Sequence, residues 1–199
     1  VCSSDLINLS NQSDGFNITG SASADTITGS TGNDTIVGFV GSDTVDGGTG
    51  TDVITLSATS ADLNAASNAQ IQNVEAVSAS GAGAGVTITL SNQTEGFTVT
   101  GSGFADTITG STGADNISAG AGNDTIVGFV GTDTVDGGTN TDTLSLSGTS
   151  TDLNSALDAQ LVNVENITTS AAATINLSNQ SDGFNITGSA SADTITGST

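Results

Sequence analysis

A nine-residue period constrains this chain more than any other feature of its sequence. Its clearest copy is GSTGNDTIV, from Gly29 to Val37, with glycine first, aspartate sixth and an aliphatic residue eighth. The phrase recurs in register over residues 20–55 and 101–145, and a further block begins at Asp193. A fixed short period of this kind predicts a solenoid, in which each unit buries its apolar face only against its neighbours.

A longer repeat contains the nonamers. The sequence from Ile7 to Thr31 returns letter for letter from Ile175 to Thr199, and a divergent copy runs from Thr87 to Thr112. We therefore divide one continuous solenoid into large repeats at 7–87 and 88–174 and the start of a third at 175–199. The second large repeat holds one additional nonamer, Gly113 to Ala121. The insertion of one whole nonamer indicates that the nonamer is the structural unit.

The first six residues, Val1 to Leu6, do not match the stretches that precede the later copies of this repeat. A back-translation of VCSSDL can match the end of a common sequencing-library adapter. We interpret residues 1–6 as a non-native scar and leave them out of the fold argument. The rest of the chain has no cysteine, so we expect no disulfide to hold it together.

The residue order within the nonamer predicts a strand and a turn. Thr-Ile-Thr after the aspartate is β-prone, with isoleucine inward and threonine outward, and the glycine-rich residues before it favour a turn. One nonamer then forms half a coil, and two close a coil that stacks on the next at about 4.8 Å. We expect an all-β, right-handed parallel β-roll or β-helix solenoid.

The segments 55–80 and 145–169, which come after the nonamer blocks, interrupt the period. Each opens with an alternating strand and continues with T-S-x-D-L-N, in which Thr59 or Ser60 can cap a short helix through Leu63 and Ala66. Each closes with another strand-like stretch that contains Asn-Val-Glu. We treat Glu75 and Glu165 in these stretches as hydrogen-bond acceptors rather than as a catalytic pair.

The charge balance excludes several classes of function. The 199 residues include 21 acids and no Lys, Arg or His, which gives a net charge of −21. Nucleic-acid binding needs cations, and an anionic membrane surface would repel this chain. Nucleophilic catalysis usually needs a His or Lys base. From the missing basic residues we expect no nucleic-acid partner and no enzyme activity, although carboxylates alone leave a paired-carboxylate hydrolase possible in principle. No stretch of 18 apolar residues is present, so we expect no membrane insertion.

Stacked coils would place like charges together. Asp25 would lie above Asp43 and Asp34 above Asp52, on opposite edges of the solenoid. Two carboxylates about 5 Å apart repel by about 1 kcal/mol in water and by about 3–4 kcal/mol at an effective dielectric constant near 20. The chain offers no Lys or Arg to offset this repulsion. A carboxylate with several turn carbonyls is a hard, all-oxygen ligand set, which suits Ca²⁺.

The nonamer resembles the RTX (haemolysin-type) calcium-binding repeat, GGxGxDxUx. GGTGTDVIT, from Gly47 to Thr55, matches at every defined position, and GSTGNDTIV lacks only the second glycine. In that family the sixth-position aspartate binds calcium together with turn carbonyls. The resemblance implies calcium ligands at Asp25, Asp34, Asp43, Asp52, Asp106, Asp115, Asp124, Asp133, Asp142 and Asp193.

Several copies depart from the family phrase. The second glycine is absent from most copies, and Phe39 and Phe129 enter the turn in two of them. We therefore expect partial occupancy, with the pairs Asp34–Asp52 and Asp115–Asp133 as the best sites. The alternative is that the aspartates only stabilise turns through side-chain hydrogen bonds and bind no ion.

The resemblance implies a structural role outside the cell. We expect a calcium-stiffened stretch of a large secreted or cell-surface bacterial protein, such as an adhesin or a surface-layer component, that folds where calcium is plentiful. Its candidate partners are calcium ions, cell-surface glycans and neighbouring repeats. Two alternatives stay open: the non-catalytic flank of a secreted polysaccharide-acting or proteolytic enzyme, and a carbohydrate-binding module.

Overall fold

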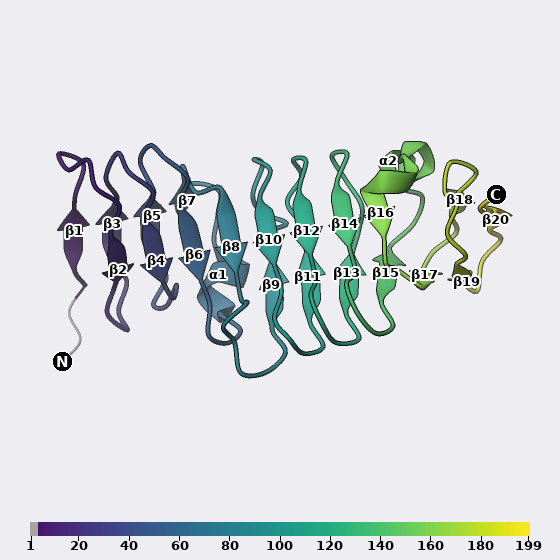
Figure 1. Ribbon diagram of the computed structural model, residues 1–199, viewed down its shortest axis with the longest axis horizontal. Helices are drawn as coiled ribbons and strands as arrows, with labels where there is room; N and C mark the ends of the chain where they lie inside the picture. The colour runs from purple at the N-terminus through teal and green to yellow at the C-terminus, as the bar shows by residue number, and fades with distance from the viewer. Residues whose placement is uncertain (1–3) are drawn as a thin grey trace.

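The computed structural model describes residues 4–199 as a parallel β-solenoid of about ten turns (Figure 1). Each turn of the solenoid, here called a coil, contains two short strands joined by two turns. Odd-numbered strands form one face and even-numbered strands the other, and every strand pairing is parallel. The all-β parallel solenoid predicted from the period is confirmed.

The odd-numbered face contains two sheets. The first consists of β1 (Leu6–Asn8), β3 (Thr26–Thr28), β5 (Thr44–Asp46) and β7 (Ile71–Gln72). The second consists of β9 (Thr87–Thr89), β11 (Thr107–Thr109), β13 (Thr125–Val127), β15 (Thr143–Leu146), β17 (Asn166–Thr169) and β19 (Asn185–Thr187). The sheet therefore breaks between β7 and β9.

The even-numbered face breaks at a different point. Its long sheet contains β2 (Asn17–Thr19), β4 (Thr35–Val37), β6 (Val53–Thr55), β8 (Ala76–Ser78), β10 (Thr98–Thr100), β12 (Asn116–Ser118), β14 (Thr134–Asp136) and β16 (Leu161–Val162). A short sheet of β18 (Thr174–Asn176) and β20 (Thr194–Thr196) comes next. The pairing of β8 with β10 runs across the junction between the first two large repeats.

The core is a stack of aliphatic ladders. The middle residue of the nonamer strands points inward, as Ile27 and Ile36 show, and its flanking residues are more exposed. The exception among the described strands is β20, whose middle residue, Ile195, is 45% exposed. The register aligns these middle residues from coil to coil, for example Ile108 with Ile126 and Ile126 with Leu144. Each aliphatic side chain is therefore buried by the coils above and below it, which is why one nonamer cannot be stable alone.

A short helix lies at each sheet break. Helix α1 (Ala61–Ala65) begins after Ser60, whose Oγ accepts the Leu63 N–H at 3.0 Å, as the capping pattern predicted. Asn64 of α1 takes the place of a neighbouring strand for β9, donating to the Thr87 carbonyl and accepting the Thr89 N–H. Helix α2 (Thr151–Ser155), with the 3₁₀-helix η1 (Asp158–Gln160) after it, repeats this arrangement beside β18.

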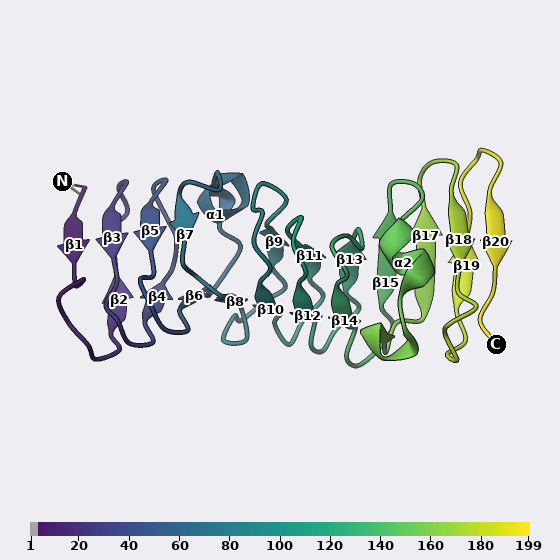
Figure 2. The same cartoon turned by 90° about the horizontal axis from the view of Figure 1, so that it is seen from above.

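The two helices lie on opposite edges of the solenoid. In Figure 1 α1 lies towards the lower edge and α2 lies at the upper edge, and Figure 2 shows α1 occupying the space between β7 and β9. The inserted nonamer accounts for this difference, because it supplies the extra strand β12. One added half coil moves every later element to the other edge.

Residues 1–3 lie outside the described part of the chain, so the structure says nothing of half of the expected scar. Leu6 begins β1, and the Asp5 N–H donates to Asp25 Oδ1 at 2.6 Å. Among the described residues, no helix has the length and apolar character that a membrane crossing needs.

Candidate metal site

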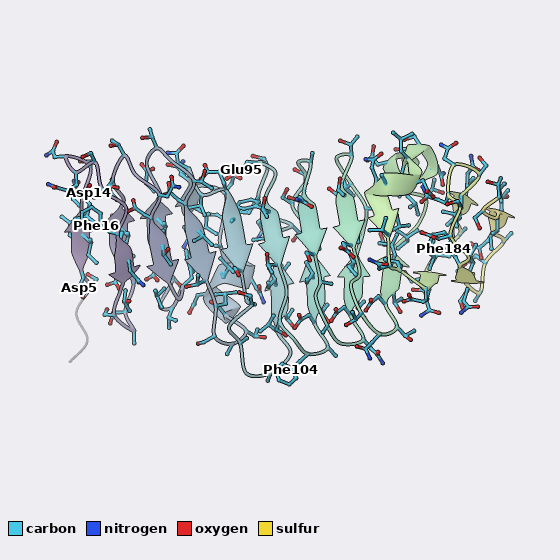
Figure 3. The ribbon with its side chains drawn as sticks, in the orientation of Figure 1. Asp5, Asp14, Phe16, Glu95, Phe104 and Phe184 are labelled. Atoms are coloured by element: carbon cyan, nitrogen blue, oxygen red, sulfur yellow. The ribbon has the colours of Figure 1, made fainter. Side chains whose placement is uncertain are left out.

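The sixth-position aspartates form two columns, one along each edge of the solenoid. Turns that lead from odd to even strands lie along the upper edge of Figure 1, and turns that lead from even to odd strands lie along the lower edge. Figure 3 marks these edges with Asp14 and Glu95 above and Phe104 below. The upper column contains Asp34, Asp52, Asp115, Asp133 and Asp193, and the lower column contains Asp25, Asp43, Asp106, Asp124 and Asp142.

Hydrogen bonds connect each column from coil to coil. The backbone N–H of Asp34 donates to Oδ1 of Asp52 at 2.6 Å, and the N–H of Asp124 donates to Oδ1 of Asp142 at 2.8 Å. The same bond joins the other stacked pairs, Asp25 to Asp43, Asp106 to Asp124 and Asp115 to Asp133. The stacking predicted from the 18-residue coil is confirmed.

Glutamates continue the columns where the nonamers stop. The N–H of Asp52 donates to Glu75 Oε2 at 2.8 Å, and the N–H of Asp142 donates to Glu165 Oε2 at 2.7 Å. Both glutamates therefore act as backbone acceptors, in keeping with the interpretation of the Asn-Val-Glu stretches.

Nine of the ten aspartates are buried, and Asp193 is partly exposed. Burial raises the pKa of Asp52, Asp133 and Asp142 to about 6. Neighbouring carboxylates add to the rise, including Asp34 and Glu75 beside Asp52. At neutral pH these groups are therefore charged, buried and close to other negative charges.

Four further aspartates have shifted pKa values, three because of burial and one because of a hydrogen bond. Burial raises the pKa of Asp43, Asp115 and Asp124. Asp25 differs, because the N–H of Asp5 donates to its carboxylate and lowers its pKa. At Asp25 the donors outweigh burial, whereas at Asp115 burial outweighs the hydrogen bonds from Phe97 and Ser111.

The residue at position two divides the turns into three kinds. In the first kind, here called serine turns, position two is Ser21, Ser30, Ser102, Ser111 or Ser189. In the turn of Asp34, the Ser30 N–H donates to Oδ2 at 2.6 Å. The Ser30 hydroxyl lies 2.7 Å from the Asp14 carbonyl oxygen and 3.2 Å from Oδ1, and either atom can accept its single hydrogen. The Ser30 hydroxyl oxygen also accepts the Gly32 N–H. All five serine turns repeat the serine N–H at Oδ2 of the aspartate and the serine hydroxyl within hydrogen-bond distance of Oδ1.

In the second kind, the phenylalanine turns, Phe39 or Phe129 is buried at position two. Positive φ falls on Gly38, Gly41 and Ser42 and not on Phe39, so the bulky residue avoids the strained left-handed backbone. The Val40 N–H donates to Oδ2 of Asp43, and the Val130 N–H does so for Asp133.

Phenylalanine turns also dock the helices. The Ser60 hydroxyl donates to the Phe39 carbonyl, and the Gly41 N–H donates to Asp62 of α1. Ser150 and Asp152 make the same contacts with the turn of Phe129.

In the third kind, the glycine turns, position two is Gly48, Gly120 or Gly138, each with a positive φ between 97° and 107°. The aspartates of these turns are Asp52, Asp124 and Asp142. Oδ2 of each is buried and has no hydrogen-bond partner among the described residues. A buried carboxylate oxygen without a donor is costly, so these three atoms require an explanation.

Two of the glycine turns hold a small cradle, in which the aspartate Oδ2 and a backbone carbonyl oxygen approach the first-position glycine together. Gly29 and Gly101 of two serine turns share this arrangement, so the unpartnered Oδ2 is what sets the glycine turns apart. A Cβ added to Gly47 would lie 2.6 Å from Asp52 Oδ2 and 2.0 Å from the Asn73 carbonyl oxygen. A Cβ on Gly137 would lie 2.8 Å from Asp142 Oδ2 and 2.0 Å from the Asn163 carbonyl oxygen. In the turn of Asp124 an alanine, Ala119, stands at the first position. A buried carboxylate oxygen beside a backbone carbonyl is a donor set that fits calcium.

Acidic side chains alone would not complete a site. Within residues 4–199, no three acidic side chains converge on a point where they could hold a metal ion together. Backbone carbonyls would have to supply the remaining ligands. Of the pairs Asp34–Asp52 and Asp115–Asp133, which the sequence ranked first, only Asp52 keeps a carboxylate oxygen without a donor.

Sequence reasoning missed the position-two serines as functional residues. The signal was present, because serine replaces the second glycine in half of the copies, but its meaning depends on hydrogen bonds that only the folded turn shows. It also missed Asp62 and Asp152 as helix-docking residues.

Comparison with known proteins gave one match. A family described as the RTX calcium-binding nonapeptide repeat (4 copies) matches residues 19–54, 98–126 and 109–144, which together cover less than half of the chain. Neither a search of curated proteins nor a search of solved structures gave a match. The matched stretches contain all nine buried aspartates.

Proposed function

From the premise that this chain carries RTX calcium-binding nonapeptide repeats, we propose that it is a calcium-binding structural region of a secreted or cell-surface bacterial protein, of adhesin or surface-layer type. The observation that carries the proposal is the pair of buried aspartate columns in a chain without Lys, Arg or His. An ion from outside the chain is the available counter-charge for these columns.

Folding and ion binding are coupled in this proposal. Asp52 and Asp142 would hold calcium with the carbonyl oxygens that face the same cradles, Asn73 and Asn163. Bound calcium supplies positive charge and oxygen coordination. The unfolded chain lacks the stacked coils that bring carboxylate and carbonyl together, so binding favours the folded state. The chain would stay extended at the low calcium level inside a cell and fold at the higher level outside.

Circular dichroism and thermal melting against calcium test the proposal. We expect millimolar calcium to raise the melting temperature by roughly 10 °C or more, as ligand linkage predicts for tight sites on a domain of this size. Magnesium serves as the control, because its demand for octahedral geometry suits an all-protein cage poorly. Identical melting curves in chelator and in calcium would refute calcium binding as the function.

Carbohydrate binding is a second candidate, and a repeated hollow favours it. A hollow of about 430 Å³ is lined by residues that include Asn68, Asn73, Glu75 and Glu95. A smaller one of about 190 Å³ is lined by Asn163, Glu165 and Asp182 at the equivalent place in the second large repeat. Amide and carboxylate groups can bind sugar hydroxyls, although no Trp or Tyr is present for stacking. A glycan array with and without calcium tests this function.

A further inference from the structure

In the serine turns, hydrogen-bond donors already occupy both carboxylate oxygens of the aspartate. In the turn of Asp115, Oδ2 accepts the Ser111 N–H at 2.7 Å, and Oδ1 accepts both the Ser111 hydroxyl at 3.0 Å and the Phe97 N–H at 2.7 Å. A cation bound there would have to displace hydrogen atoms that already point at both carboxylate oxygens. Each donor therefore both satisfies the carboxylate and opposes a metal ion.

Backbone conformation separates the two kinds of turn. In the glycine turns φ is positive at positions two and four, as at Gly48 (97°) and Gly50 (129°). No described residue of a serine turn has a positive φ. In the glycine turns the position-two N–H makes no hydrogen bond to the aspartate Oδ2 that the serine N–H contacts elsewhere. The choice of residue at position two thus decides whether that oxygen receives a donor.

Two of the three glycine turns lie at the ends of the nonamer blocks, next to the helical segments. Those of Asp52 and Asp142 come last in their nonamer blocks, directly before the strands that lead into α1 and α2. Each lies one coil from the glutamate that comes next in its column, Glu75 or Glu165. The third, that of Asp124, lies one coil before Asp142 on the same edge.

We propose that serine at position two stands in for calcium, so that this chain binds calcium only at the glycine turns of Asp52, Asp124 and Asp142. The five serine turns are ion-independent, and the two phenylalanine turns are satisfied by Val40 and Val130. Calcium then acts chiefly where each nonamer block meets its helical segment. This inference rests on the proposed calcium-binding function and specifies where that function is exercised.

Exchanging the position-two residues tests the proposal in both directions. The substitution Ser30→Gly converts residues 29–37 into GGTGNDTIV, and Ser111→Gly makes the equivalent change in the second block. Bound calcium per folded chain is measured by equilibrium dialysis and elemental analysis on the full chain. We expect about three ions in the original chain and one more in either variant. Ser30→Ala is the matched control, and we expect it to gain no ion.

The reverse exchange, Gly48→Ser, should remove one ion and leave the turn stable in chelator. Gly48→Ala is its control, because both variants add the same Cβ, which would lie 2.2 Å from the Ser30 carbonyl oxygen unless the turn changes conformation, and only serine brings a hydroxyl. We expect both variants to bind about two ions. In chelator, however, Gly48→Ser should melt at or above the original temperature and Gly48→Ala below it.

The outcomes separate this inference from the proposed function. Two results would overturn the serine inference and leave calcium binding standing. One is about ten bound calcium ions in the original chain. The other is that neither Ser→Gly variant binds an additional ion although circular dichroism shows that both are folded. No bound calcium in the original chain would overturn both. Hydrogen exchange in chelator adds a second readout: protection should persist at residues 29–37 and fall at residues 47–55 and 137–145.

Discussion

At the scale of single residues, each nonamer places one carboxylate in a turn and differs from other nonamers in how that carboxylate is hydrogen-bonded. Position six supplies the charge. Where position two is serine, its hydroxyl and amide donate to the carboxylate, and where position two is glycine, the aspartate Oδ2 receives no donor among the described residues. Position one must stay small in four of the turns, because the aspartate Oδ2 and a carbonyl of the next coil approach it together at Gly29, Gly47, Gly101 and Gly137. Small differences between copies therefore change chemistry without changing the strand.

Gly47→Ala tests the requirement at position one. Its Cβ would lie 2.0 Å from the Asn73 carbonyl oxygen, so we expect a loss of about 2–3 kcal/mol in the free energy of unfolding, measured with urea in saturating calcium. Gly81→Ala is the control, because nothing lies within 4 Å of an added Cβ there. Equal stability of the two variants would contradict the crowding argument.

The raised pKa values predict an unusual pH dependence. Asp52, Asp133 and Asp142 have folded pKa values of about 6 against an unfolded value near 4. Between these values the folded state binds more protons, so stability falls as pH rises from about 4 to 6 and stays low above that range.

In calcium-free buffer we therefore expect the melting temperature to be roughly 5 °C or more higher at pH 5 than at pH 7.5. Saturating calcium should remove most of this difference at pH 7.5, because the ion replaces the protons of Asp52 and Asp142. A variant in which all three aspartates are changed to asparagine should lose most of the pH dependence. Melting that is independent of pH in the original chain would contradict the assignment.

At the scale of elements, strands, turns and helices are joined by side-chain hydrogen bonds as well as by sheet pairing. The N-cap serine of each helix donates to the phenylalanine turn, and an asparagine on each helix pairs with the next strand. The helices thus continue the solenoid across each sheet break instead of lying as separate insertions.

Ser150→Ala tests this connection. The substitution removes the cap of the Leu153 N–H and the bond to the Phe129 carbonyl, so we expect a loss of about 1–2 kcal/mol by urea unfolding. Ser57→Ala, at an exposed position outside the cap, should change stability by less than about 0.5 kcal/mol. A Ser150→Ala effect as small as that of Ser57→Ala would mean that the cap does not fasten the helix.

The sequence predicted most elements but not their exact chemistry. The strands are predicted by the aliphatic residue two places after each aspartate, and α1 by Ser60 and the apolar Leu63. The three kinds of turn could not be read in advance, because they depend on φ and on which amide reaches each carboxylate. In the turn of Phe39, for example, Gly38, Gly41 and Ser42 carry the positive φ and Phe39 does not.

At the scale of the whole molecule, the number of nonamers sets the placement of every later element. The first large repeat advances the solenoid from β1 to β9, an even number of strands, and the second from β9 to β18, an odd number. The break beside α1 therefore lies on the odd-numbered face and the break beside α2 on the even-numbered face.

Deleting residues 113–121 should move α2 to the edge that carries α1. Spin labels at single cysteines introduced on the two helices, with Cys2 replaced, would report this as a shorter distance. Deleting residues 101–118, two nonamers, is the control and should leave the helices on opposite edges. An unchanged arrangement after the one-nonamer deletion would show that the nonamer does not act as half a coil.

The inserted nonamer also has a consequence for recognition. A binding partner that grips the helix of the first large repeat and another that grips the helix of the second must approach from opposite sides of the rod. Had both large repeats held an even number of half coils, the same partners would have gathered along one side. The insertion of nine residues is thus enough to place the two helices, and any partners that bind them, on opposite sides of the solenoid instead of on one side.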